Sequence, residues 1–156
     1  MTIGIIVYSE TGNTLTVART LEQQLSSQGH PVTLEQLQVT GNPRSKDQLQ
    51  LASRPNLEEY ERLIMGSPVH AFSLSPAMTA FLQQIPSLDQ KPTIAFVTQF
   101  FPFAWMGGNR ALRQMTTLCK ERSGRLLASA VINWSHPRRD PNISKIVERL
   151  SQKIIQ

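Results

Sequence analysis

Short apolar runs recur along the chain, and segments with helical spacing separate most of them. The first run, TIGIIVY at residues 2–8, is apolar at nearly every position. Runs of this kind are typical of strands covered on both faces, as in a parallel sheet. Strands that alternate with helices therefore predict an α/β fold whose sheet is parallel. The predicted strands span residues 2–8, 31–39, 60–67, 92–99 and 125–134, and the predicted helices span residues 13–28, 75–85, 107–122 and 141–155.

Residues 40–56 are the one stretch to which the pattern assigns no element. They hold the polar segments GNPRSKDQ and SRPN around a short apolar fragment, which is the composition of turns. No internal repeat and no interdomain linker divides the chain. Because 156 residues suffice for one hydrophobic core, we expect a single domain over residues 1–156.

The net charge indicates which kinds of molecule this protein contacts. With 16 Lys and Arg against 11 Asp and Glu, the net charge is +5, which favours contact with something anionic. The basic residues are scattered and form no block with stacking aromatics, so a solvated basic surface is a simpler interpretation than nucleic-acid binding. The single cysteine, Cys119, excludes an internal disulfide and lies on an apolar helical stripe, where we expect a buried, inert thiol.

The apolar segments also bear on location. None approaches the ~18 consecutive apolar residues of a membrane span. The N-terminal segment MTIGIIV has no basic flank and no small-residue cleavage site, so it is interpreted as a first strand and not as a signal peptide. We therefore expect a cytoplasmic protein without a membrane span.

Unusual residues gather directly after three of the predicted strands. In a parallel sheet of this class, ligands bind beyond the carboxyl ends of the strands, where the strand order reverses. The first strand runs into SETGNT, the third into GSPVHAFSLSP and the fourth into TQFFPFAWMGG. So many rings in the last connection indicate either a flat ligand or a protein partner beside them. The rings are Phe100, Phe101, Phe103 and Trp105.

The segment SETGNT, at residues 9–14, has the composition of an anion site. A strand-to-helix turn offers unpaired backbone N–H groups and the positive end of the helix dipole, and Ser9, Thr11 and Thr14 can add hydroxyl donors. Gly12 lets the backbone approach closely. The nucleotide motifs GxxxxGK[ST] and GxGxxG are absent, so a single phosphate monoester, held without a positive side chain, is the predicted ligand. The alternative is that these residues only cap the following helix.

The same segment resembles the [ST]-x-T-G-x-T phosphate loop of flavodoxins and related flavin mononucleotide (FMN) proteins in residue type, spacing and place in the chain. The resemblance covers all 156 residues as a pattern of strands and helices, with MGSPV at residues 65–69 as a second, weaker match. It implies a flavodoxin-like three-layer α/β/α sandwich with a five-stranded parallel sheet of order 2-1-3-4-5. It also implies that the FMN phosphate binds to Ser9, Glu10, Thr11, Gly12, Asn13 and Thr14.

The resemblance further implies that two other loops enclose the isoalloxazine ring of FMN. His70 is interpreted either as a contact of the flavin or as a solvated loop residue. Phe101 and Trp105 are interpreted either as rings that stack on the flavin or as part of a self-association patch. The implied residues are Ser67, Pro68, Val69, His70, Ala71 and Phe72 in one loop, and Thr98, Gln99, Phe100, Phe101, Trp105, Gly107 and Gly108 in the other.

Three departures from electron-carrier flavodoxins bear on function. The carriers are typically acidic, whereas this chain is basic. Ala71 occupies the position at which the carriers commonly have a small flexible residue, whose peptide group forms a hydrogen bond to the flavin. A positive φ costs alanine more conformational free energy than it costs glycine. In the third loop, FFPFAWMGG replaces the usual glycine and acidic residue, which is closer to the reductases of this fold that accept hydride from NAD(P)H.

The sequence thus predicts an FMN-binding redox flavoprotein. It would act in electron transfer, with a redox protein as partner, or in NAD(P)H-dependent reduction of a quinone or other small acceptor. The chemistry belongs to the cofactor, so we predict neither a catalytic side chain nor a metal site. A homodimer is implied by analogy with reductases that complete the flavin pocket across subunits. The alternative is a partner-binding or regulatory module of the same fold without a catalytic flavin.

Overall fold

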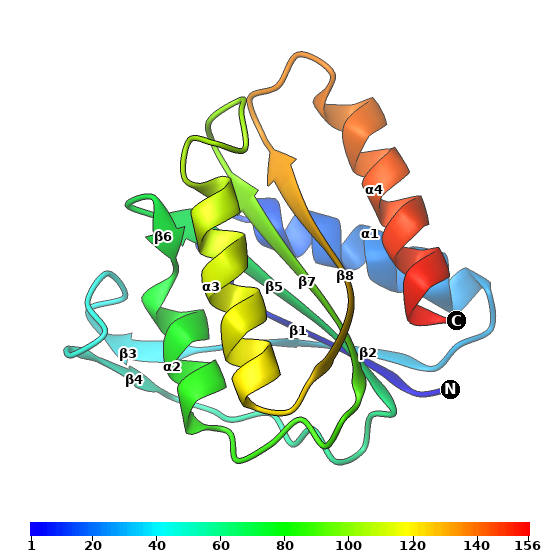
Figure 1. Cartoon of the computed structure of the whole chain (residues 1–156), viewed down its shortest axis with the longest axis horizontal. Coiled ribbons are helices and arrows are strands. Elements are labelled where there is room, and N and C mark those ends of the chain that lie inside the picture. The colour runs from blue at the N-terminus through cyan, green and yellow to red at the C-terminus, as the bar shows by residue number, and fades with distance from the viewer.

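Five parallel strands form the central sheet in the structure, a computed structural model that describes residues 1–156 (Figure 1). Counting these strands alone, their order is 2-1-3-4-5, as predicted. The order reverses between the first and third strands, because the chain runs outward from the first strand in one direction and then in the other. The strands are β1 (Ile3–Val7), β2 (Val32–Gln36), β5 (Arg62–His70), β7 (Pro92–Gln99) and β8 (Arg125–Asn133).

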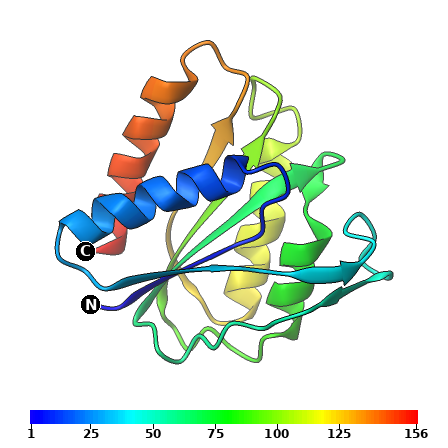
Figure 2. The same ribbon diagram turned by 180° about the vertical axis from the view of Figure 1, so that it is seen from behind.

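Four helices cover the two faces of the sheet. The alternation of side chains along β1 divides them, since Ile3, Ile5 and Val7 pack with one pair of helices and Ile6 with the other. Figure 2, seen from behind, shows the first pair in front of the sheet. None of the helices has the length and apolar character needed to cross a membrane. The first pair is α1 (Asn13–Ser27) and α4 (Arg139–Ile154), and the second is α2 (Pro76–Gln84) and α3 (Gly108–Glu121).

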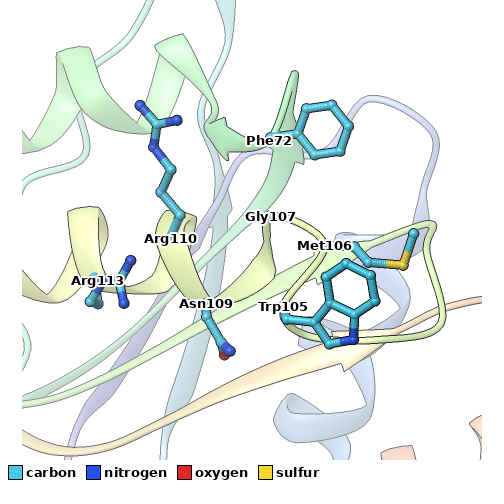
Figure 3. A pocket seen from close by; sticks show the side chains of 7 residues that line it. All are labelled: Phe72, Trp105, Met106, Gly107, Asn109, Arg110 and Arg113. Atoms are coloured by element: carbon cyan, nitrogen blue, oxygen red, sulfur yellow. The ribbon is translucent and has the colours of Figure 1, made fainter.

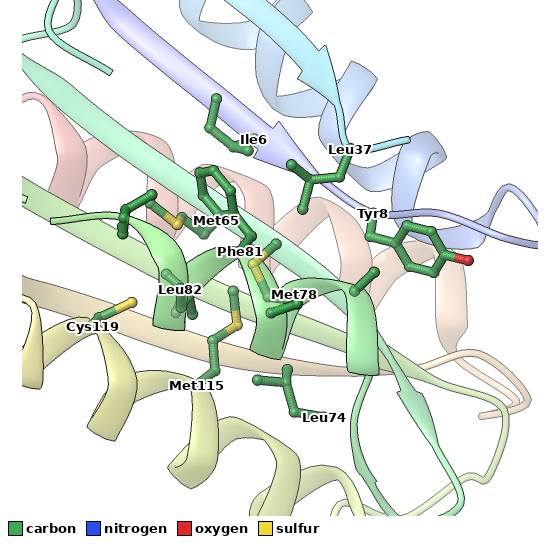
Figure 4. Close-up of a cluster of buried hydrophobic side chains, with 14 of the residues drawn as sticks. Ile6, Tyr8, Leu37, Met65, Leu74, Met78, Phe81, Leu82, Met115 and Cys119 are labelled. Atoms are coloured by element: carbon green, nitrogen blue, oxygen red, sulfur yellow. The ribbon is translucent and has the colours of Figure 1, made fainter. Parts of the chain in front are cut away.

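The larger of the two cores lies between the sheet and the pair α2 and α3 (Figure 4). Met78, Phe81 and Leu82 of α2 face Met115 and Cys119 of α3, and all five side chains are fully buried, as their helical spacing predicts. Burial raises the pKa of the Cys119 thiol to about 12. The sulfur is therefore protonated at neutral pH, which agrees with the predicted inert thiol.

The stretch to which the sequence assigned no element forms a small separate sheet. β3 (Val39–Gly41) pairs antiparallel with β4 (Leu49–Leu51), so the crossover from β2 to β5 contains no helix. The predicted strand 31–39 is thus two strands, because β2 ends at Gln36. At the other end of the crossover, β5 continues past residue 67 to His70 and pairs antiparallel with the short strand β6 (Ser73–Leu74).

Candidate functional site

The loops that follow β1, β5 and β7 leave the same edge of the sheet, because the three strands are parallel neighbours. This edge includes the point where the strand order reverses, between β1 and β5. In sheets of this class that is where ligands bind. The fold therefore brings the three unusual segments of the sequence to one place.

The loop after β1 and the first turn of α1 hold a run of unpaired backbone donors. None of the amide groups from Ser9 to Thr14 donates a hydrogen bond within the chain, whereas the next amide, that of Leu15, donates to Ser9 Oγ at 3.3 Å. Gly12 makes this path of the backbone possible: its φ is 96°, in the left-handed region, and a Cβ atom there would meet nothing within 4 Å. The free amides lie at the positive end of the α1 dipole, which favours an anion.

The hydroxyl groups of this loop differ in their partners. Thr14 is buried, and its Oγ1 lies 2.7 Å from Oγ1 of Thr98 at the end of β7. Ser9 accepts the Leu15 amide, so it caps α1. Thr11 is exposed and makes no hydrogen bond. The capping alternative thus accounts for Ser9, and it leaves Thr11 and the free amides unexplained.

A positive side chain reaches this loop from a distant part of the chain. Arg44, in the connection between β3 and β4, lies with Nη2 3.4 Å from Oε2 of Glu10. The same carboxylate oxygen lies 2.7 Å from Nε2 of His70. A positive side chain, which the sequence did not predict here, therefore lies beside this loop and pairs with Glu10. Nothing in the sequence linked Arg44 to residues 9–14, because the segment that carries it had no predicted element.

His70 is a buried member of this site. Its side chain is 8% exposed and packs edge-on against the ring of Tyr8, with the ring centroids 6.2 Å apart. Burial and the charge of Arg44 lower the pKa of His70. The neutral ring donates from Nε2 to Glu10, which leaves Nδ1 as a buried acceptor without a partner. The interpretation of His70 as a solvated loop residue is thus excluded.

The three loops line a common cavity of about 220 Å³. Gln99 adds a second buried acceptor without a partner there, its Oε1 atom. Residues from the loop with unpaired backbone donors, and the two residues with unpaired acceptors, His70 and Gln99, therefore line one cavity. The residues that line it are Glu10, Thr11, Asn13, Pro68, Val69, His70, Thr98, Gln99 and Phe100, all predicted, together with Arg44.

A turn beside this cavity carries an exposed ring on strained backbone. Ala71 and Phe72 join β5 to β6 with φ values of 49° and 63°, the combination found in two-residue type I′ turns, where Asn and Gly are preferred. Phe72 is 54% exposed. Its ring lies nearly parallel to that of Phe101, with 4° between the planes and 5.7 Å between the centroids. This pair of rings offers a planar ligand a surface for stacking.

Gln99 anchors the loop that follows β7. Its Nε2 donates at 2.6 Å to the carbonyl oxygen of Phe103 and at 2.6 Å to Oδ1 of Asn133. Farther along this loop, Trp105 is 75% exposed and stacks on Phe103. Trp105 lines a separate groove of about 480 Å³ (Figure 3). Phe72, Trp105, Met106, Gly107, Asn109, Arg110 and Arg113 line this groove.

Two predicted site residues support the fold and do not line the cavity. Ser67 Oγ is buried 2.7 Å from Oγ of Ser75, which in turn accepts the Met78 amide and caps α2. A Cβ atom on Gly108 would lie 2.6 Å from Val131, so glycine lets α3 begin close against β8. Both residues position the loops that carry the site.

Comparison with known protein families identifies this domain. The flavodoxin domain model matches residues 4–102, more than half of the chain. The chain belongs to the flavodoxin domain family. This membership confirms the resemblance drawn from SETGNT, and with it FMN as the cofactor that the family supports. A comparison with curated protein sequences finds no match.

Solved flavodoxins share the fold along nearly the whole chain. The flavodoxin of Streptococcus pneumonia TIGR4 is 13% identical with a TM-score of 0.74, and the match covers 99% of this chain and 98% of that one. Oxidised flavodoxin 1 of Bacillus cereus is 15% identical with a TM-score of 0.73, covering 99% and 97%. A flavoprotein of Lactobacillus acidophilus NCFM, solved in complex with FMN, is 15% identical with a TM-score of 0.64, covering 92% and 97%. At such low identity these matches bear on the fold alone.

Proposed function

We propose that this flavodoxin domain binds FMN at the cavity beyond β1, β5 and β7 and works as an NAD(P)H-dependent reductase of a quinone or other small acceptor. The phosphate would bind at residues 9–14, and the isoalloxazine ring would bind against residues 68–72 and 98–101. One observation carries the proposal: the consecutive amides from Ser9 to Thr14 have no acceptor within the chain. Ser9, Gly12, Asn13 and Thr14 are buried or half-buried, and amides in such positions are rarely left without partners, so this run favours an external anion.

The phosphate loop fits a dianionic ester. A dianionic phosphate monoester only accepts hydrogen bonds, and the free backbone amides of residues 9–14 and the Thr11 hydroxyl can all donate one. The negative charge of Glu10 is offset by Arg44, whose Nη2 lies 3.4 Å from the carboxylate oxygen Oε2. The pair therefore leaves the dipole of α1 to attract the phosphate.

The rest of the cavity fits the polar edge and the faces of a flavin. The ring and the ribityl chain of FMN carry N–H and O–H donors, and His70 Nδ1 and Gln99 Oε1 are acceptors without partners. The parallel rings of Phe72 and Phe101 give the flat face a stacking surface. Donors, acceptors and aromatic surface thus occur in the combination that FMN needs.

The residues of this chain bind and orient, and the cofactor carries the chemistry. Bound FMN supplies two-electron chemistry, by which NAD(P)H, a quinone and one proton yield NAD(P)⁺ and a hydroquinone. Phe72, which stacks on Phe101, also lines a groove of about 480 Å³, and this groove gives a small donor or acceptor room near the rings, which supports a reductase over a carrier that meets only proteins. No side chain needs to act as a general acid or base.

A spectroscopic titration tests this proposal. The purified chain is titrated with FMN and followed through the visible flavin absorbance, and the loaded protein is then mixed with NADPH or NADH without oxygen. We expect stoichiometric binding and bleaching in one two-electron phase, with recovery of the absorbance when a quinone is added. A folded, colourless chain that ignores FMN would contradict the proposal and would favour a partner-binding module of this fold.

We also propose that residues 1–156 act as one domain in the cytoplasm and that two copies associate through the rings beside the cavity. Phe100 and Phe103 are 71% and 52% exposed, which supports an apolar contact there. Sedimentation equilibrium with and without FMN tests the dimer. A dimer weakened by Phe103→Ser is expected, and a monomer at every concentration would contradict it.

A further inference from the structure

We propose that Arg110 and Arg113 form the recognition site for an anionic group on the aromatic donor or acceptor that this protein uses. This inference rests on the proposed function, since it names the chemistry of the small molecule that reaches the flavin. The two side chains border two adjoining hollows, of about 480 Å³ and 540 Å³. They therefore stand in the middle of one continuous groove along the start of α3.

The groove changes in character from one end to the other. Phe72 and Trp105 form an aromatic end, close to the stacked pair that Phe72 makes with Phe101 (Figure 3). Thr79 and Gln83 of α2, with Thr117 of α3, form a neutral polar end. A ligand that fits this order has a planar ring, then an oxyanion, then a polar extension.

The two arginines have no partner within the chain. The three salt bridges of the protein involve other residues, and neither guanidinium donates a hydrogen bond. No acidic residue lines either part of the groove. Arginine binds phosphate, sulfonate or carboxylate through paired N–H groups, so two free guanidinium groups over a hollow favour an anionic ligand.

The position of this charge is unfavourable for the helix itself. Arg110 and Arg113 lie in the first two turns of α3, whose first turn has no acidic residue, so both charges oppose the helix dipole. They are also three positions apart, where like charges repel on a helix. A bound oxyanion would relieve both effects, which explains why the charges stand at this end of α3.

Calorimetric titration of the FMN-loaded protein tests the site, with the same titration on the chain as purified. The probes are NADPH, 2′,5′-ADP and anthraquinone-2-sulfonate, so that a phosphate-bearing donor and an anionic acceptor are distinguished. The test variant is Arg110→Gln with Arg113→Gln. The matched control is Arg19→Gln, an exposed arginine on α1, which covers the opposite face of the sheet.

We expect at least one probe to bind and the double variant to bind it about tenfold or more weakly, as the loss of charge-assisted hydrogen bonds predicts. Arg19→Gln should bind the probe like the wild type, and all three proteins should bind FMN equally, which separates this inference from the proposed function. The inference is overturned if no probe binds, if the double variant binds as the wild type does, or if Arg19→Gln weakens binding as much. Binding of an acidic redox protein through the same arginines, with no small probe bound, would also overturn it.

Discussion

The two ends of the proposed FMN site are built by opposite means. At the phosphate end, the main chain supplies the donors, and a glycine, Gly12, takes the one positive φ that the loop requires. At the ring end, side chains supply the contact surface, and Ala71 and Phe72 take positive φ values that cost a residue with a Cβ about 1–2 kcal/mol. The backbone of the phosphate end is therefore unstrained and its donors are already free, whereas the backbone of the ring end is strained beside exposed aromatic side chains. Strain of this kind persists where function needs a particular geometry.

The largest expected effect is on FMN affinity, from a substitution that alters only the phosphate end of the site. Thr11→Ala removes a free hydroxyl that can donate to the phosphate, and a hydrogen bond to a charged group is worth roughly 1.5–3 kcal/mol. We expect FMN affinity to fall by a factor that corresponds to this loss, while riboflavin affinity stays the same. Fluorescence titration with each flavin measures both. Thr16→Ala is the control, because Thr16 Oγ1 already donates to the Gly12 carbonyl oxygen; an equal loss in the control would contradict the assignment of Thr11.

The next largest effect is on the affinity for both flavins, from a substitution that alters only the ring end of the site. Phe72→Ala removes one ring of the parallel pair, and we expect FMN and riboflavin to lose affinity by the same amount, about 1–2 kcal/mol, because both present the same ring. Phe103→Ala is the control for loss of a similarly exposed ring, since Phe103 stacks on Trp105, and both variants are titrated at a protein concentration at which each is monomeric. Selective loss of FMN binding in the Phe72 variant would mean that this ring does not touch the flavin.

A smaller effect, on the free energy of unfolding, tests whether the ring end is more strained than the phosphate end. Ala71→Gly should raise the free energy of unfolding by about 1 kcal/mol, because glycine adopts φ of 49° without the Cβ penalty. Gly29→Ala is the inverse control: Gly29 has φ of 89° in open space, so a similar loss of stability is expected there. Urea unfolding of the chain without flavin measures both. A destabilising Ala71→Gly would show that the turn is not strained.

The smallest effect concerns pH. The pKa of His70 lies below its usual 6.5 because of burial and the charge of Arg44, with Glu10 opposing. Between the folded pKa and 6.5 the unfolded chain binds more protons, so stability rises with pH there and falls as the solution is acidified through 6.5. Urea unfolding at several pH values should give a shallower slope for His70→Gln than for the wild type. Equal slopes would contradict the buried, neutral state of this ring.

The sequence predicted the features that depend on local chemistry. The parallel strands were predicted because both faces of each strand are covered, which leaves an apolar run such as IGIIV in β1. The strand-to-helix turn at residues 9–14 was predicted because such a turn needs a glycine and hydroxyl residues directly before a helix, and its role in binding phosphate stays a prediction. In both cases the residues that determine the structure are neighbours in the chain.

What the sequence missed depends on contacts between distant segments. β3 and β4 are short, and Leu49 becomes buried and Leu51 partly buried against the core of α2, which no local pattern indicates. Arg44 reaches Glu10 only because this small sheet brings its connection to the phosphate loop. Arg110 and Arg113 have the spacing of a solvated helix face, and only the fold places them over a groove. Contacts between segments that are distant in the sequence determine the surroundings of each of these residues.

The most direct test of the whole account compares FMN with riboflavin, which differ only in the phosphate. If the amides of residues 9–14 hold that group, the wild-type protein should bind FMN at least about 100-fold more tightly, since several hydrogen bonds to a dianion are lost with riboflavin. Equilibrium titration followed by flavin fluorescence gives both dissociation constants. Equal affinity for the two flavins would contradict the central claim.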